Sequence, residues 1–371
     1  MQEWLNGLNP EQQQAVTTTE GHIRVVAGPG TGKTRALTAR YCYLTETLGV
    51  PARNILCVTF TNKAANEMKQ RIRSWIGDLD LGYISTLHAF CVQFLKEEIH
   101  FLHFPKNFII LDVEDQRTLL LKIFEEMGLT LKEATIKQKI DEVLEARKIS
   151  ADGYIDEIFT LDNTDLEKRI KETDDINESI FLRYLYEQKK NFACDFNDLI
   201  NFTAYILKRF PDVLHKWQER MQYIMVDEFQ DVSAKQYSIT QLLAGKHQNL
   251  FIVGDPDQTI YTWRHAHVRL FLDFDKVYPD ARTIVLRTNY RSSPEILKVA
   301  DTLIRKNVLR FPKELQATKP HGLKPLYFHA QSEKEEADWI ASEIKKLMKS
   351  DVPADHIAVL YRAHYLTRSL E

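Results

Sequence analysis

Residues 27–34 form a glycine-rich run, AGPGTGKT, that stands between a predicted strand and a predicted helix. Residues 23–26 (IRVV) predict a short buried strand, and a helical pattern begins near Lys33. Glycines in such a turn let backbone N–H groups curl around phosphate oxygens, and the N-terminus of the following helix adds a positive dipole. The run fits the Walker A pattern, with Ala27 where the stricter form has its first glycine. A chance glycine turn rarely matches every position in this setting, so the run predicts a nucleoside triphosphate site.

The residue types in this loop assign chemistry to individual positions. Lys33 should reach the β- and γ-phosphates, and the hydroxyl of Thr34 should hold Mg²⁺. The predicted nucleotide-binding positions of the loop are Ala27, Gly28, Pro29, Gly30, Thr31, Gly32, Lys33 and Thr34.

Two further polar segments follow apolar runs, as the phosphate loop does. Asp227 and Glu228 follow residues 223–226, and an acid at the carboxyl end of a parallel strand faces the ligand crevice. Asp227 can hold Mg²⁺, while Glu228 can orient or deprotonate the attacking water. Gln258, which comes after the apolar residues 250–253, can sense the γ-phosphate or align water. Each segment alone could be a solvated strand end or a polar turn, but beside a phosphate loop the catalytic interpretation is favoured.

Strands and helices alternate along the first part of the chain. Residues 55–59 predict another strand and residues 63–75 a helix, which indicates a parallel, doubly wound α/β sheet. The pattern then becomes mostly helical; Asp112 could cap one of these helices and Gly128 could close it. The first domain is expected at residues 1–290, with a core at 1–96 and 217–280 and an all-helical insertion at about 97–216.

A second α/β stretch is predicted from residue 281 to residue 371. Its helix should follow Ser332, with Glu335 completing a capping box, and Ile340 and Ile344 should lie on its apolar face with Leu347. Three strands are few for a sheet domain, which indicates that this second domain is incomplete. The strands predicted in it are residues 284–286, 326–328 and 357–360.

Composition excludes several classes of protein. The four cysteines show no metal-ligand spacing and are too few for a disulfide framework. No apolar stretch approaches the length of a membrane span, and the first residues lack the pattern of a secretory signal. A cytoplasmic location is therefore expected. The net charge of -3 neither demands nor forbids nucleic acid, because phosphate contact depends on local charge.

Taken in order, the motifs resemble those of superfamily-one DNA helicases of the UvrD/Rep/PcrA type, and the match covers almost the whole chain. The phosphate loop and the acid pair are two of the motifs. The segments that carry the resemblance are residues 8–13 (LNPEQQ), 27–34, 60–68 (FTNKAANEM), 85–90 (STLHAF), 194–199 (CDFNDL), 227–231 (DEFQD), 254–264 (GDPDQTIYTWR) and 289–292 (NYRS). The resemblance implies a RecA-like P-loop domain, followed by the first part of a second RecA-like domain.

The resemblance also implies roles that spacing cannot supply. ATP would be the nucleotide, with Gln12 reading the adenine edge and Tyr290 and Arg35 stacking on its two faces. Arg291 would contact the γ-phosphate from the second lobe, as an arginine finger does. Single-stranded DNA would be the partner, held by a track of Phe60, Asn62, His88, Tyr261, Trp263 and Arg264.

The family mechanism is translocation. Closing and reopening of two lobes with each ATP would move the strand and give 3′-to-5′ unwinding, in DNA repair or replication. His265 stands where the family commonly has glycine after Trp-Arg, which affects the local turn. Motifs V and VI of the family are expected beyond residue 371, so the chain is expected to be a fragment that binds ATP and single-stranded DNA but unwinds weakly.

Two alternatives remain open from the sequence. The chain could be a naturally short binding module that holds nucleotide or DNA without turnover. It could also be the motor part of a helicase–nuclease of the RecB/AddA type, although those chains usually carry longer insertions and a nuclease domain.

Overall fold

The computed structural model describes residues 3–129, 161–260 and 267–370, together with positions 135, 138 and 142. The chain divides into two units, Met1–Pro320 and His321–Glu371. The predicted DNA-contacting residues Tyr261, Trp263 and Arg264 lie outside the described residues, as does His265.

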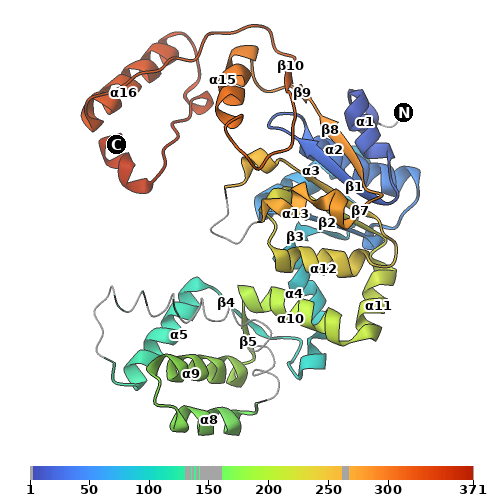
Figure 1. The fold of residues 1–371 in the computed structure, drawn as a ribbon, viewed down its shortest axis with the longest axis vertical. Coiled ribbons are helices and arrows are strands. Elements are labelled where there is room, and N and C mark those ends of the chain that lie inside the picture. Colours follow the sequence, from blue (N-terminus) through green and yellow to red (C-terminus); the bar gives the residue numbers. More distant parts are fainter. Residues whose placement is uncertain are drawn as a thin grey trace. The chain divides into compact units, whose positions relative to one another are not determined.

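The first unit contains a parallel sheet of six strands in the order β3-β2-β6-β7-β1-β8 (Figure 1). The predicted strands 55–59 and 223–226 have those bounds in the structure, and the predicted α/β class is confirmed. The strands are β1 (His22–Ala27), β2 (Ile55–Thr59), β3 (Tyr83–Thr86), β6 (Tyr223–Val226), β7 (Leu250–Gly254) and β8 (Arg282–Leu286).

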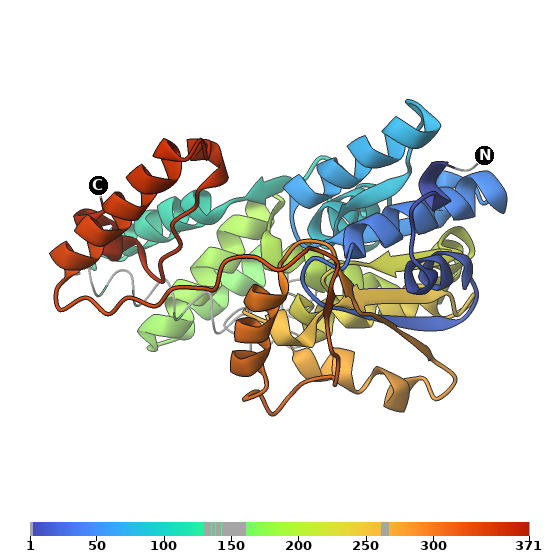
Figure 2. The ribbon, with the colours of Figure 1, turned by 90° about the horizontal axis from the view of Figure 1, so that it is seen from above.

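Both faces of this sheet are buried, which explains why the central strands β2, β6 and β7 are mainly apolar. Side chains alternate between the faces: Val25 and Cys57 belong to one core, whereas Val26 and Leu56 belong to the other. Helices that contribute to the first core are α1 (Pro10–Thr17), α2 (Lys33–Cys42) and α3 (Asn62–Ile76). Helices that contribute to the second are α4 (Leu87–Glu98), α9 (Ile176–Lys190), α10 (Phe196–Arg209), α11 (Pro211–Arg220), α12 (Ala234–Ala244), α13 (Val268–Leu272) and α14 (Phe274–Val277). Figure 2 shows the ribbon from above.

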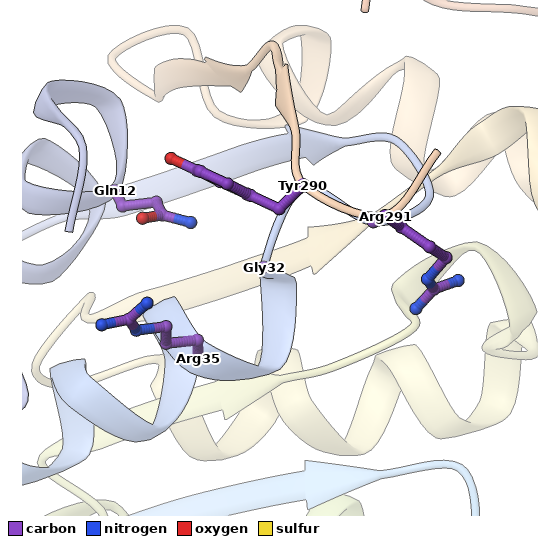
Figure 3. A pocket seen from close by; sticks show the side chains of 6 residues that line it. Gln12, Gly32, Arg35, Tyr290 and Arg291 are labelled. Atoms are coloured by element: carbon purple, nitrogen blue, oxygen red, sulfur yellow. The ribbon is translucent and has the colours of Figure 1, made fainter. Parts of the chain in front are cut away.

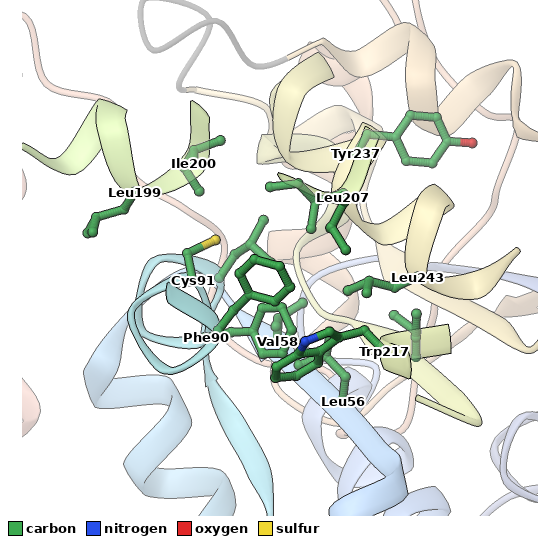
Figure 4. Close-up of a cluster of buried hydrophobic side chains, with 14 of the residues drawn as sticks. Leu56, Val58, Phe90, Cys91, Leu199, Ile200, Leu207, Trp217, Tyr237 and Leu243 are labelled. Atoms are coloured by element: carbon green, nitrogen blue, oxygen red, sulfur yellow. The ribbon is translucent and has the colours of Figure 1, made fainter. Parts of the chain in front are cut away.

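Trp217 belongs to the second core and is fully buried (Figure 4). Its ring centroid is 5.7 Å from that of Phe90 and 4.9 Å from that of Phe94. Its indole Nε1 donates a hydrogen bond of 2.8 Å to Oε1 of the buried Glu98, which also accepts from Lys216 at 2.6 Å. This side chain therefore joins α11 to α4 through both apolar and polar contacts.

Helices form most of the described part of the segment between α4 and β6. Asp112 caps α5 (Val113–Glu126) by accepting from the backbone N–H groups of Glu114 and Asp115, and Gly128 follows the helix at φ +67°, as predicted. A short parallel pair, β4 (Ile109–Leu111) with β5 (Ala193–Asp195), was not predicted, because strands of three residues show no alternation. Two more helices of this segment are α8 (Asn163–Glu172) and α9 (Ile176–Lys190).

The predicted strand at residues 284–286 is present, but it belongs to the first sheet. It is the edge strand β8 and pairs with β1, whose other side pairs with β7. Two short strands, β9 (Thr288–Asn289) and β10 (Gln316–Ala317), follow β8 and pair with each other. In the sequence, α15 (Pro294–Ile304) lies between them. Sequence position alone indicated the wrong sheet because strand pairing is a contact between distant residues.

The second unit contains α16 (Glu333–Lys349), which is the predicted helix. Ser332 accepts from the backbone N–H of Glu335, and the Glu335 carboxylate accepts from the backbone N–H of Gln331. The strands predicted at 326–328 and 357–360 are wrong: no strand is assigned among residues 321–370. Leu326 is 79% exposed and Leu360 is 94% exposed, so these apolar runs have no sheet partner that would order them as strands. Among the described residues, no helix has both the length and the apolar character needed to cross a membrane.

Candidate functional site

The phosphate loop connects the carboxyl end of β1 to the first turn of α2. Gly30 and Gly32 have φ angles of +69° and +81°, which favour glycine, and the Thr31 hydroxyl donates to the Gly28 carbonyl at 2.8 Å. The loop therefore closes on itself and leads directly into the N-terminus of a helix, where backbone N–H groups are available to an anion. The structure thus has a closed glycine loop before a helix N-terminus where the sequence predicts a phosphate site.

The acid pair lies beside this loop. The Lys33 ammonium is 2.7 Å from Oε2 of Glu228. This contact joins the first turn of α2 to the acid pair that follows β6. Asp227 is buried at the end of β6, and this burial, followed by the charge of Glu228, raises the pKa of its carboxyl group, whereas Lys33 opposes the shift. Glu228 has a φ of +46°, a left-handed conformation that costs a non-glycine residue free energy and is common at functional sites.

These residues also fit a magnesium ion. Thr34 lies in the first turn of α2 and offers a hydroxyl, and Asp227 offers a carboxylate whose Oδ1 accepts the backbone N–H of Glu228 at 3.0 Å. Both are oxygen donors, the type that Mg²⁺ prefers. A cation would also offset the repulsion between Asp227 and Glu228 that the raised pKa reflects.

Gln230 connects the acid pair to the segment that carries Gln258. Its Nε2 donates to Oε2 of Glu228 at 2.9 Å, and its Oε1 accepts the backbone N–H of Asp255 at 2.9 Å. Asp255 in turn accepts from Nε2 of Gln258 at 2.7 Å. Sequence reasoning did not single out Gln230; its position between Glu228 and Asp231 was the only signal. The structure therefore places Gln258 in the same hydrogen-bonded network as the acid pair.

A cavity of about 290 Å³ lies beside the phosphate loop (Figure 3). The residues that line it are six predicted site residues: Gln12, Gly30, Gly32, Arg35, Tyr290 and Arg291. Arg35 and Tyr290 lie far apart in the sequence of the first unit. Arg35 donates to the Asn6 carbonyl at 2.8 Å, and the Tyr290 hydroxyl accepts from the Asn9 side chain at 2.9 Å.

Gln12 is buried at the rim of this cavity. Its Oε1 accepts the backbone N–H of Asn9 at 3.1 Å, which completes the capping box of α1. Its Nε2 donates to the Thr31 carbonyl at 2.8 Å. Both ends of the amide thus bond to the protein backbone, and Gln12 fixes the phosphate loop against α1.

Asn289 holds the segment of Tyr290 and Arg291 against the loop. Its side chain is fully buried; Nδ2 donates to the Pro29 carbonyl at 2.6 Å, and Oδ1 accepts the backbone N–H groups of Arg291 and Ser292. Sequence reasoning did not assign it a role, because the contact joins residues 260 positions apart.

We expect Gly30→Ala to weaken both folding and nucleotide binding. A Cβ at residue 30 would lie 2.6 Å from the Cβ of Arg291 and 2.9 Å from Nδ2 of Asn289, and φ is +69°. The backbone strain alone costs about 1–3 kcal/mol, and the clash adds to it. Urea unfolding and binding of a fluorescent ADP should both be measured. Gly49→Ala is the matched control, because Gly49 has a φ of +68° but no atom lies within 4 Å of the place that its Cβ would take; equal losses in the two variants would contradict the predicted clash.

A second cavity, of about 880 Å³, lies where β2, β3 and β6 end. Phe60 and His88 line it together with Asp227 and Glu228, so two of the predicted DNA contacts share a space with the acid pair. The ring of His88 is 6.1 Å from that of Phe196 in an edge-on arrangement, and burial lowers the pKa of His88. Asn62 is the first residue of α3. It is exposed and is not among the residues that line this cavity.

Comparison with known proteins gives matches over nearly the whole chain. The profile of the UvrD/REP helicase N-terminal domain matches residues 8–279, and that of the UvrD-like helicase C-terminal domain matches residues 284–371. The ATP-dependent DNA helicase PcrA of Staphylococcus aureus is 37% identical over 99% of this chain, and that of Staphylococcus epidermidis is 36% identical over the same share. The chain spans about half the length of these relatives, 49% in each case.

Proposed function

The chain belongs to the UvrD/REP helicase family, and from this membership and the geometry of the site we propose that it hydrolyses ATP to move along single-stranded DNA. Movement in the 3′-to-5′ direction would separate the strands of a duplex. The observation that carries the proposal is the 2.7 Å contact of Lys33 with Glu228 beside the phosphate loop, with Asp227 next to both.

In this proposal, Lys33 has two partners. A bound triphosphate would compete with Glu228 for the ammonium group, because phosphate oxygens carry more negative charge than one carboxylate. The Glu228 carboxylate would then be free to accept a proton from the attacking water, while Gln230 continues to hold it at Oε2. Mg²⁺ held by Thr34 and Asp227 would neutralise charge on the phosphates. The exchange of partners would thereby couple nucleotide binding to activation of the base.

The adenine and the γ-phosphate are assigned to the cavity beside the loop. Tyr290 and Arg35 line it from different segments, which suits stacking on both faces of a flat base. Gln12 would read the adenine edge only by exchanging one of its two backbone bonds. Arg291 lines the same cavity and is proposed to contact the γ-phosphate.

DNA is assigned to the larger cavity and its surroundings. Phe60 and His88 supply rings there, and flat rings stack on any base without reading sequence. Because this cavity also reaches Asp227 and Glu228, a change at the acid pair could be transmitted to a bound strand over a short distance. The full proposed track is Phe60, Asn62, His88, Tyr261, Trp263 and Arg264.

Lys33→Ala tests the proposal. Loss of this one charge at the phosphates is expected to lower ATP hydrolysis about 10²–10³-fold, because such electrostatic contacts act on charge that develops in the transition state. Phosphate release should be measured with and without single-stranded DNA, which is expected to raise the wild-type rate.

The control for this experiment is Lys122→Ala, since the Lys122 side chain is 59% exposed on α5 and distant in sequence from every motif. Equal hydrolysis by the Lys33→Ala and wild-type proteins would contradict the proposal. Nucleotide binding without turnover in the wild type would instead favour a binding module.

A further inference from the structure

A buried group of charges lies next to Gln258, and its two basic residues, Lys313 and Arg310, lie in a part of the chain that the sequence motifs do not include. Lys313, which follows α15, has a side chain that is only 4% exposed. Its Nζ is 2.6 Å from Oδ1 of Asp255 and 2.5 Å from Oδ2 of Asp257, whose side chains are 1% and 6% exposed. Arg310 lies 3.4 Å from Asp257. Buried ion pairs contribute little net stability because desolvation offsets their attraction, so stability alone is a weak explanation for this arrangement.

Hydrogen bonds connect this group to the phosphate loop without a break. Lys313 donates to Oδ1 of Asp255, and Oδ2 of the same carboxylate accepts from Gln258 at 2.7 Å. The backbone N–H of Asp255 donates to Gln230, which donates to Glu228, which is the partner of Lys33. The two buried lysines thus lie at opposite ends of one network.

The backbone that carries Lys313 is also fixed to the loop. Leu315 packs against Gly28, where an added Cβ would lie 2.8 Å from the Leu315 side chain. The next residues form β10, which pairs with β9 immediately before Tyr290. Lys313 therefore approaches Asp255 from a segment whose position depends on the phosphate loop.

We propose that Lys313 is a positioning residue for ATP hydrolysis, acting through Asp255 to orient the side-chain amide of Gln258. This inference rests on the proposed function. The terminal torsion of a glutamine is broad, so its amide needs a fixed acceptor to hold one orientation. Asp255 is such an acceptor: Lys313 donates to its Oδ1, which holds the carboxylate so that Oδ2 faces the Gln258 amide. Lys313 itself does not touch the nucleotide.

The experiment compares binding of ADP with binding of ADP plus aluminium fluoride, which mimics the transferred phosphate, in wild type and Lys313→Gln. Because the sensor acts on the γ-phosphate position, ADP affinity should stay within about threefold, whereas affinity for the mimic should fall about tenfold, the size expected for one hydrogen bond. The kcat for ATP should fall by a similar factor with little change in KM. Lys313→Arg, which keeps the charge, should recover part of the loss, and Lys306→Gln, at an exposed lysine of the same segment, should match the wild type.

A double variant separates positioning from general damage. If Lys313 acts through Gln258, the double variant Lys313→Gln with Gln258→Ala should bind ADP plus aluminium fluoride no more weakly than the weaker-binding of the two single variants. The inference would be overturned if the losses of affinity in the two single variants multiplied in the double variant. It would also be overturned if folded Lys313→Gln bound the mimic as tightly as the wild type.

If Lys313→Gln fails to fold, the double variant Lys313→Gln with Asp257→Asn can replace it, because it removes one base and one acid together. This double variant is expected to show the same selective loss of affinity for ADP plus aluminium fluoride. Normal mimic binding in that pair would also overturn the inference. Absence of any nucleotide binding by the wild type would contradict the proposed function itself, so the two failures can be told apart.

Discussion

Glu228→Gln is expected to abolish most ATP hydrolysis while leaving nucleotide binding intact. Loss of a general base lowers rates roughly 10²–10⁴-fold. Glutamine keeps the size of the side chain and an oxygen that can accept from Lys33, so the contact at 2.7 Å has a neutral replacement. Single-turnover hydrolysis and fluorescent ADP binding measure the two effects separately.

The same substitution has a second consequence that supports its assignment. The charge of Glu228 is one cause of the raised pKa of Asp227, after burial. Removing that charge should lower the pKa of Asp227 and favour its ionised form, the form that binds Mg²⁺. We therefore expect Mg²⁺-dependent nucleotide affinity to be unchanged or higher in Glu228→Gln. Weaker Mg²⁺-dependent binding, or hydrolysis within tenfold of wild type, would contradict the assignment; Glu126→Gln, at an acid that is 50% exposed on α5, is the control.

Trp217→Ala is expected to destabilise the fold strongly. Truncating a fully buried tryptophan costs about 3–5 kcal/mol, because apolar contacts are lost and a cavity remains. The contacts of Trp217 with Phe90 and Phe94 would be lost, and Glu98 would keep Lys216 as its partner while losing the indole donor. Urea unfolding followed by circular dichroism gives the difference in the free energy of unfolding.

Trp217→Phe divides this cost into its parts. Phenylalanine keeps a ring in the core but removes the hydrogen bond to Glu98, and a hydrogen bond to a charged group contributes about 1.5–3 kcal/mol. The Phe variant should therefore lose less stability than the Ala variant. Equal losses would mean that the hydrogen bond, and not the packing of the ring, dominates.

The elements that could be predicted well from sequence are those whose signal is local. Residues 55–59 and 223–226 are buried on both faces and therefore read as unbroken apolar runs with clear ends. The strand at 284–286 was also visible, but its sheet was not, because pairing with β1 is a contact across more than 250 residues. The runs at 326–328 and 357–360 show the reverse error: apolar composition permits a strand but does not supply a neighbour.

The site divides in the same way. Lys33, Asp227 and Glu228 could be predicted because each follows a strand, and parallel strands bring their carboxyl ends to one edge. Gln230, Asn289 and Lys313 could not, because their roles consist of contacts with distant segments. The Asn289 amide reaches Pro29 across 260 residues, and Lys313 reaches Asp255 across 58.

The edge strand β8 lies only a few residues before Tyr290 and Arg291. The chain leaves the sheet at Leu286, and only Arg287 and Thr288 precede the asparagine that is bonded to Pro29. The backbone that carries Tyr290 and Arg291 is therefore anchored both at the sheet and at the phosphate loop.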